Sequence, residues 1–372
     1  MSRGGRVLHA ADGRVVLQLP QGRLITVAND DETLRAGDLV ALTPLQLSRV
    51  WSHPTGEFPD PASRDRKLYN PESWAVLGQR AVLLRGIRHF FEERGFLEVE
   101  TPLVVPSPGT EVHLAPTAVQ QTDRPGAEPK PAFLITSPEY HMKRLLAAGS
   151  PPIFQLCKTF RDGERGVHHR PEFTMLEWYR PWSTLETILE DCEALIRSVF
   201  KTGTLSYQGM QIELTGSWPR LSFLTLLRER ASIAAPEKLS SEEQLAAFVA
   251  HVEPSLGTER PEFVVDYPLS MASLARPSPS DPTVAERSEL YIAGLEIANA
   301  FGELVDPQAQ RQRCEADNIK RRELQLPELP LDEDFLGALE QGLPPSGGIA
   351  LGVDRLAMLY TDKACIDEVV CF

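Results

Sequence analysis

The order of strand-like and helix-like hydrophobic patterns limits this 372-residue chain to a few fold classes. Segments of alternating hydrophobicity precede and separate the helical segments, without the regular strand–helix–strand cadence that builds a parallel sheet. The sequence also lacks a glycine-rich phosphate loop of the dinucleotide-binding or P-loop kind. The pattern therefore predicts an α+β fold in which helices flank an antiparallel sheet.

The first 65 residues are expected to form a small β-rich unit. Turn signals such as Asp12-Gly13 and Ala36-Gly37 separate short strand-like segments, over residues 6–10, 14–19, 23–27 and 38–42. This pattern is typical of a small β-barrel or meander. A turn- and proline-containing connection follows it, so we expect an N-terminal unit over residues 1–65 and a catalytic domain over residues 68–372.

Several start and stop signals define the helices of the larger domain. Asn70-Pro71 begins a helical pattern that Gly95 ends, and two capping boxes follow, Ser183 with Glu186 and Ser240 with Glu243. Further helices are expected over residues 307–324 and 332–341, and strands over residues 263–267, 290–297 and 348–351.

Charge and hydropathy restrict the partners. The net charge of -14 opposes broad attraction to a polyanion, so stable tRNA binding is not expected, although a local basic patch can coexist with net acidity. No run of about 18 apolar residues occurs, so we expect a cytoplasmic protein without a membrane-spanning helix.

A charged loop between two apolar stretches brings together residue types that suit a nucleotide. Arg161 ends the first stretch, and Phe173 lies at the start of the second. A guanidinium matches the geometry of phosphate, and an aromatic ring can stack on a base. An ordinary salt-bridged hairpin is the alternative interpretation.

A second candidate element is a glycine-containing strand that runs from Gly347 into an apolar helix carrying Arg355. Glycine within a strand indicates close approach of backbone or ligand, and an arginine at a helix start can meet phosphate or nucleobase. A close-packed turn explains this motif equally well when it is considered alone.

Together with the helix that Gly95 ends, these elements resemble motifs 1, 2 and 3 of the class II aminoacyl-tRNA synthetases, over roughly residues 68–372. Three segments, residues 137–146, 171–179 and 289–303, are similar to the lysyl branch. The amino-acid sequences of these segments match those of lysyl-tRNA synthetase-like paralogues that ligate (R)-β-lysine to elongation factor P. The N-terminal unit is shorter than the usual anticodon-binding domain of lysyl-tRNA synthetases.

The resemblance implies roles for individual residues. Binding of ATP and catalysis would involve Arg161, Phe173 and Arg355, with Glu164 and His169 from the loop. Mg²⁺ would be held by Glu289 and Glu296. The amino-acid pocket would be formed by Glu139, Glu177, Tyr179, Ala298, Asn299, Phe301 and Glu303.

The resemblance also implies the reaction: activation of (R)-β-lysine or lysine by ATP, followed by transfer to elongation factor P, in a homodimer. Two alternatives stay open, a trimmed lysyl-tRNA synthetase that charges tRNA and a catalytically silent regulatory paralogue. Ala298 replaces a glycine that is usual in lysyl-tRNA synthetases. We expect Ala298→Gly to raise the kcat/KM for α-lysine relative to that for (R)-β-lysine, by removing a methyl group beside the substrate.

Overall fold

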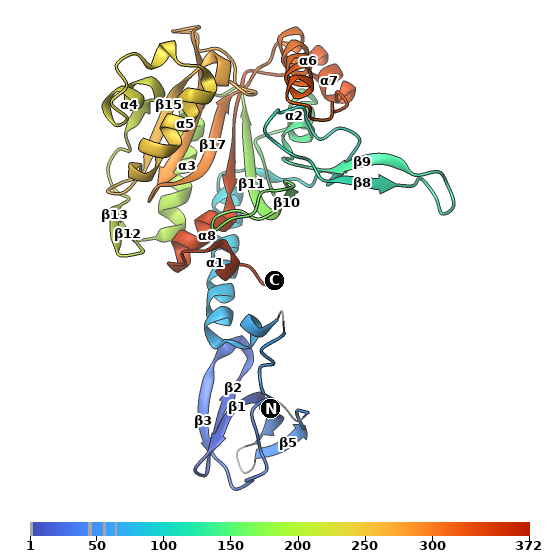
Figure 1. Cartoon of the computed structure of the whole chain (residues 1–372), viewed down its shortest axis with the longest axis vertical. Coiled ribbons are helices and arrows are strands. Elements are labelled where there is room, and N and C mark those ends of the chain that lie inside the picture. Colours follow the sequence, from blue (N-terminus) through green and yellow to red (C-terminus); the bar gives the residue numbers. More distant parts are fainter. Residues whose placement is uncertain (1–2, 44–46, 55–56, 64) are drawn as a thin grey trace. The chain divides into compact units, whose positions relative to one another are not determined.

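The computed structural model describes residues 3–43, 47–54, 57–63 and 65–372 (Figure 1). It contains two compact units, one formed by residues 1–84 with 367–372 and the other by residues 85–366. Among the described residues, no helix is long and apolar enough to cross a membrane. The predicted domain boundary between residues 65 and 68 stays a prediction.

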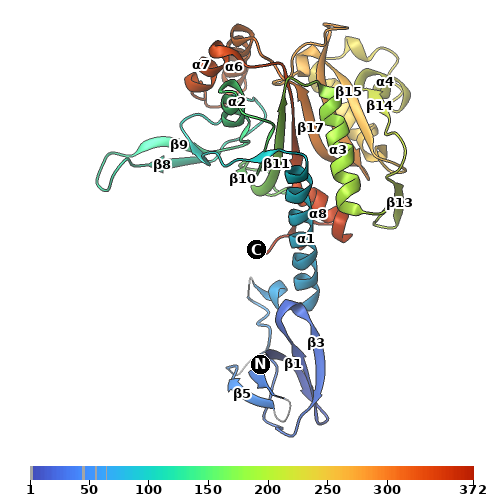
Figure 2. The same ribbon diagram turned by 180° about the vertical axis from the view of Figure 1, so that it is seen from behind.

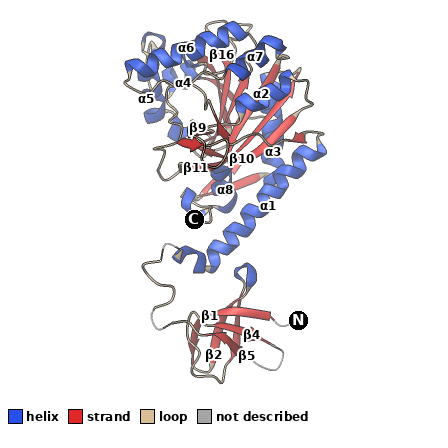
Figure 3. Ribbon diagram, turned by 90° about the vertical axis from the view of Figure 1, so that its right-hand side faces the viewer, coloured by secondary structure: helices blue, strands red, loops and turns tan. Residues whose placement is uncertain are grey.

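The first unit is a five-stranded antiparallel sheet with the order β3-β2-β1-β4-β5 (Figure 3). Its strands are β1 (Arg3–Ala11), β2 (Arg14–Gln18), β3 (Leu24–Ala28), β4 (Leu39–Leu42) and β5 (Leu47–Trp51). Alternate side chains point to one face, where Val7, Val15, Leu17 and Val40 are buried together. The predicted β-rich unit is therefore confirmed for the described part of residues 1–65.

Helix α1 (Pro71–Glu93) begins and ends where the sequence predicts. The Asn70 side chain accepts a hydrogen bond from the Glu72 backbone N–H at 3.0 Å. Gly95, with φ of +72°, lies in the left-handed region that ends many helices. Near the end of the helix, Phe91 stacks on Phe154 with ring centroids 4.7 Å apart.

An eight-stranded sheet forms the centre of the second unit, with the order β14-β15-β16-β17-β18-β11-β10-β6 (Figure 1). The six strands from β15 to β10 pair antiparallel, and only the edge strands β14 and β6 pair parallel. This arrangement confirms the predicted antiparallel sheet. Its strands are β6 (Leu97–Glu98), β10 (Ile153–Phe160), β11 (Glu172–Pro181), β14 (Arg220–Ser222), β15 (Glu262–Pro268), β16 (Val284–Ile292), β17 (Leu295–Gly302) and β18 (Ser346–Gly352).

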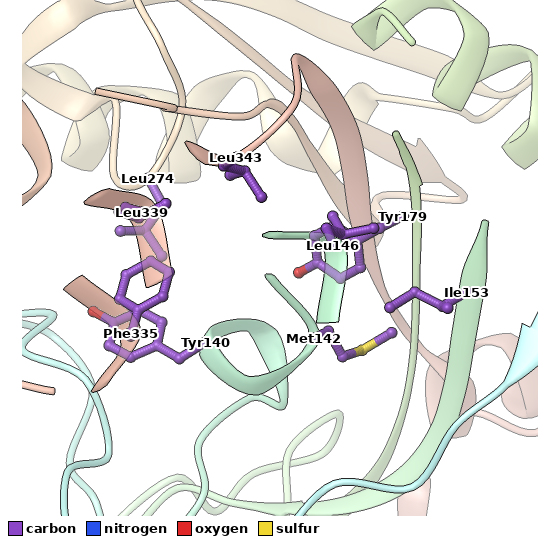
Figure 4. Close-up of a cluster of buried hydrophobic side chains, with 9 residues drawn as sticks. All are labelled: Tyr140, Met142, Leu146, Ile153, Tyr179, Leu274, Phe335, Leu339 and Leu343. Atoms are coloured by element: carbon purple, nitrogen blue, oxygen red, sulfur yellow. The ribbon is translucent and has the colours of Figure 1, made fainter. Parts of the chain in front are cut away.

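Helices pack on this sheet and beside it. Helix α3 (Leu185–Phe200) packs on β17 and β18, as Figure 2 shows from behind, and α4 (Phe223–Glu229) packs on β15 and α5 (Ser241–His251). Helix α8 (Val353–Thr361) follows β18 and contacts β11. A separate group consists of α2 (Glu139–Ala147), α6 (Pro307–Glu323) and α7 (Glu333–Gly342), with Tyr140 stacked on Phe335 at 4.2 Å (Figure 4).

Two small sheets complete the unit. One is formed by β7 (Val104–Val105), β9 (Lys130–Leu134) and β8 (Ala118–Gln121), and the other by β12 (Thr204–Tyr207) and β13 (Met210–Glu213). In Figures 1 and 2 the β8–β9 hairpin projects away from the central sheet.

Two sequence predictions about element boundaries are wrong. The predicted strand over residues 290–297 is a hairpin, because Ala293 and Gly294 adopt φ of 57° and 72° and form a two-residue turn between β16 and β17. The cap of α3 is Thr184, whose side chain accepts from the Thr187 N–H, and not Ser183. The capping box of Ser240 and Glu243 on α5 is confirmed.

Candidate active site

The register of the central sheet brings three of the predicted site residues, Glu289, Asn299 and Glu177, to one face. Glu289 pairs with Asn299, Asn299 with Ala350, and Ala350 with Glu177. Directly paired residues of neighbouring strands share a face. The acids of β16 and β11 and the amide of β17 therefore lie on the same side of the sheet, although more than 100 positions of sequence separate β11 from β16.

Arg161 follows β10 at one end of this face. Its guanidinium carbon lies 5.2 Å from the centre of the Phe173 ring, and its backbone N–H donates to Pro171 O at 2.8 Å. Arg161 Nε is buried without a hydrogen-bond partner among the described residues. Since arginine cannot lose its charge, this group is suited to bind an anion such as phosphate. Glu164 lies in the loop beyond Arg161 and is half-buried.

Arg355 reaches the same region from the first turn of α8. The preceding residue, Asp354, accepts a hydrogen bond from the Thr174 backbone N–H at 2.7 Å, which fixes α8 beside β11. Arg355 Nη1 donates to the Glu296 carbonyl at 2.6 Å, and Nη2 contacts His169 Nε2. Burial and the Arg355 charge lower the pKa of His169 to about 4, so its imidazole is neutral and accepts from the guanidinium.

Glu289 is held by donors on every side. Tyr267 and Tyr291 donate hydroxyl hydrogen bonds to one carboxylate oxygen at 2.5 and 2.7 Å. Arg287 and Asn299 donate to the other at 2.5 and 3.5 Å. Burial alone would raise its pKa, but the Arg287 charge and these hydrogen bonds outweigh burial, and the pKa of Glu289 is lowered. Glu289 is thus an ionised carboxylate with a fixed orientation.

Glu296 is the more open of the two predicted metal ligands, with a side chain 36% exposed. Burial and the charge of Glu289 raise its pKa, whereas Arg355 acts in the opposite direction. No group of three or more His, Cys, Asp or Glu side chains among the described residues could hold a metal ion by itself. Two carboxylates near Arg161 and Arg355 do suit Mg²⁺, which takes one or two protein carboxylates together with substrate phosphates.

The other end of the face is an acidic pocket around Glu177. This buried carboxylate accepts hydrogen bonds from Ser137 Oγ at 2.6 Å and from Tyr179 OH at 2.8 Å. Burial, and next the charge of Glu139, raise the pKa of Glu177 to about 8. A buried acid without a cationic partner gains most from a positively charged ligand.

Lys143 is a pocket residue to which the sequence analysis assigned no role. Its ammonium contacts the Glu139 carboxylate one helical turn earlier and lies 2.5 Å from Glu303 Oε2. The lysine side chain is completely buried. Burial disfavours its charge, but the two carboxylates more than offset this effect and raise the pKa of Lys143. The i, i+4 spacing from Glu139 was the one available signal in the sequence.

Gly348 allows the pocket residues to approach one another. A Cβ atom at this position would clash with the Tyr179 ring and with Glu303 Oε1. The predicted close approach at the glycines of β18 is therefore present at Gly348, where the Tyr179 and Glu303 side chains occupy the space that a Cβ atom would need. Burial raises the pKa of Glu303 to about 7, with Lys143 opposing the effect. No hydrogen bond to Glu303 Oε1 is present among the described residues.

The remaining predicted pocket residues, Ala298, Asn299 and Phe301, lie on β17, but they point to different faces of this strand. Asn299 Oδ1 is buried on the pocket face without a hydrogen-bond partner among the described residues. Phe301 shares that face and packs partly against Ala275. Ala298 points to the opposite face, because side chains alternate along a strand. The structure thus offers no direct contact between the Ala298 methyl group and this pocket, and the predicted change in selectivity would have to act through the strand.

Comparison with known proteins agrees with this geometry. A family model described as tRNA synthetases class II (D, K and N) matches residues 61–372. The chain belongs to this family. The class II synthetase match begins at residue 61, so most of the N-terminal β-rich unit lies outside it.

Three curated relatives share the name elongation factor P--(R)-beta-lysine ligase. The relative from Edwardsiella ictaluri is 46% identical over 307 residues, which cover 80% of this chain and 94% of the relative. Those from Klebsiella pneumoniae strain 342 and Salmonella typhi are 43% and 42% identical over 303 residues, which cover 79% of this chain and 93% of each relative. The class II synthetase chain is therefore similar to these ligases over almost their whole length.

Proposed function

We propose that this class II synthetase-like enzyme uses ATP to activate (R)-β-lysine as an aminoacyl-adenylate and transfers the acyl group to a lysine ε-amine of elongation factor P. The observation that carries the proposal is the acidic pocket, which lies on the same sheet face as Arg161, whose Nε has no hydrogen-bond partner among the described residues. Its carboxylates suit the ammonium groups of a diamino acid, and the names of the relatives supply the particular substrates.

In the first step, a carboxylate oxygen of the amino acid attacks the α-phosphorus of ATP. A phosphorus–oxygen bond forms to the amino acid, the bond to the β-phosphate breaks, and pyrophosphate leaves with the bonding electron pair. Arg161 would stabilise the charge on the α-phosphate, with Phe173 stacked on adenine and Arg355 on the other adenine face and the γ-phosphate. Positioning and charge stabilisation suffice for this step without an enzyme nucleophile.

In the second step, a neutral lysine amine of the acceptor attacks the activated acyl carbon. A carbon–nitrogen bond forms, AMP leaves, and the nitrogen loses a proton. The proposed acceptor is a translation factor, which is also the reason to expect a cytoplasmic enzyme.

Mg²⁺ fits the part of the site that contains Glu289 and Glu296. The Glu289 carboxylate is ionised and held in one orientation, and the Glu296 side chain is partly exposed. These two residues would hold the ion, which would neutralise phosphate charge when bound. The chain itself orients Glu289 through two tyrosines and one arginine.

Exchange of pyrophosphate into ATP tests the first step. Purified enzyme with ATP, Mg²⁺ and (R)-β-lysine should catalyse exchange, with a lower kcat/KM for α-lysine. A chain with folded structure and no exchange with either isomer would be the catalytically silent paralogue. The retained Arg161, Phe173 and Arg355 support an active enzyme.

The acidic pocket predicts a pH dependence of substrate binding. The pKa values of Glu303 and Glu177 are raised to about 7 and about 8 in the empty pocket, so each carries a proton below its pKa. A substrate with two ammonium groups binds the ionised carboxylates. We therefore expect the KM for (R)-β-lysine to fall as pH rises toward about 8 and then to level off, with a limiting slope of about tenfold per pH unit below the pKa of each carboxyl that must lose a proton. Initial exchange rates at a series of pH values measure this change, and a KM independent of pH would contradict it.

We also propose a homodimer that pairs through α1. Trp74 and Val82 on this helix are 43% and 46% exposed, so their apolar side chains are available for a contact with a second copy of the chain. Phe91 on the same helix is buried against Phe154 and cannot contribute to this contact. Light scattering at micromolar concentration should give about twice the chain mass of 41.3 kDa. A monomeric mass would contradict the proposal.

A further inference from the structure

The buried ammonium of Lys143 divides the acids of the pocket into two groups. It lies between Glu139 on its own helix and Glu303 at the end of β17, 2.5 Å from Glu303 Oε2. Glu177 instead receives hydrogen bonds from the neutral hydroxyls of Ser137 and Tyr179. Among the described residues, one internal cation thus contacts two carboxylates, and no ion pair is present at Glu177.

The charge of the pocket then matches a particular class of ligand. Glu139, Glu303 and Glu177 outnumber the one ammonium, and a fourth carboxyl, Glu111, lines the same hollow as Glu139. Burial and the Glu139 charge raise the pKa of Glu111 to about 7. Burying an uncompensated charge is costly, so these acids favour a ligand that brings two ammonium groups over a ligand with only one. Without Lys143, Glu139 and Glu303 would lose the cation between them, which favours their protonated forms.

We infer that Lys143 is a positioning and specificity-determining residue: its ammonium bridges Glu139 and Glu303 and holds both carboxylates in place for the ammonium groups of a diamino acid. This inference rests on the proposed function and deepens it. Lys143 itself need not touch the reacting atoms, which lie at the Arg161 end of the site.

The surroundings of Glu303 support this role. The charged groups that act on it are Lys143 and Glu139 from α2 and Arg276 from the segment after β15, and the charge of Glu303 in turn raises the pKa of Glu177 on β11. Arg276 is engaged by Glu286, to which it donates at 2.6 Å. Lys143 is therefore the cation in direct contact with Glu303, and its removal should let Glu303 keep a proton to higher pH.

The test compares Lys143→Met, which keeps an unbranched side chain of similar length without the charge, with Lys143→Arg, which keeps a permanent positive charge. For Lys143→Met we expect the KM for (R)-β-lysine in pyrophosphate exchange to rise by roughly 30-fold or more, with a much smaller change in kcat. The fall of KM with pH should move to higher pH than in the parent enzyme. Lys143→Arg should keep the parent pH profile. The affinity for ATP should be unchanged in both variants. This result would show that the Arg161 end of the site is intact.

The matched control is Lys320→Met on α6. Lys320 is exposed, and its ammonium lies 3.8 Å from the Glu242 carboxylate in a surface ion pair, which contributes little. This variant should behave like the parent. A Lys143→Met enzyme with the parent KM and pH profile overturns the inference. So does a Lys143→Arg enzyme whose pH profile shifts, and this variant decides the matter if Lys143→Met does not fold. Failure of the proposed function is distinct, because the parent enzyme itself would then show no exchange with either lysine isomer.

Discussion

Replacing Arg161 with alanine should lower the rate of adenylate formation by about 1000-fold, which corresponds to about 4 kcal/mol of transition-state stabilisation. The reason is the state of this guanidinium: Nε is buried without a hydrogen-bond partner among the described residues, and the charge is permanent. Nε is therefore available to donate to a phosphate oxygen as charge develops on the phosphate. Single-turnover formation of the adenylate with saturating (R)-β-lysine and ATP measures the effect.

Arg311→Ala provides the control for this variant. Arg311 forms an ion pair with Glu333 between α6 and α7, and both side chains are substantially exposed. Exposed pairs contribute about 0–1 kcal/mol to stability, so activity should stay close to that of the parent. If Arg161→Ala loses no more activity than Arg311→Ala, Arg161 does not act on the reacting phosphate.

Replacing Glu296 with glutamine should abolish adenylate formation at ordinary Mg²⁺ concentrations, a loss of about 100-fold or more. Glutamine keeps the shape of the side chain but removes the negative charge that a hard cation requires. The backbone carbonyl that accepts from Arg355 stays in place, so the fold should be intact. Pyrophosphate exchange measured against Mg²⁺ concentration should show that a higher concentration is needed.

A matched variant is Glu315→Gln, which removes an exposed carboxylate on α6. Its dependence on Mg²⁺ should equal that of the parent. Parent-like exchange by Glu296→Gln at ordinary Mg²⁺ would exclude Glu296 as a ligand of the ion and reduce its role to the contact with Arg355.

Local sequence signals predicted the elements that depend on local physics. The Asn70-Pro71 start of α1, its end at Gly95 and the capping box of α5 follow from hydrogen bonds within a few residues. The α+β class followed from the order of such elements. The hairpin at Ala293-Gly294 was missed because its apolar residues continue through a two-residue turn without a polar break.

The arrangement of the site depends on contacts that no local pattern contains. Resemblance identified Glu139, Glu303 and Glu289 as candidates, but not what holds them. Lys143 reaches Glu303 across 160 positions of sequence, and Tyr267 reaches Glu289 from the neighbouring strand. Alternation along β17 could have placed Ala298 away from Asn299, had its strand limits been predicted correctly.

The proposed acyl transfer is tested most directly by the mass of the acceptor. The purified enzyme would be incubated with ATP, Mg²⁺, (R)-β-lysine and unmodified elongation factor P, and in parallel with tRNA in place of the factor. We expect intact-mass spectrometry to show that the factor gains one β-lysyl group on a lysine side chain, and that tRNA stays uncharged. An unmodified factor together with lysyl-tRNA formation would contradict the proposal and identify the chain as a trimmed lysyl-tRNA synthetase.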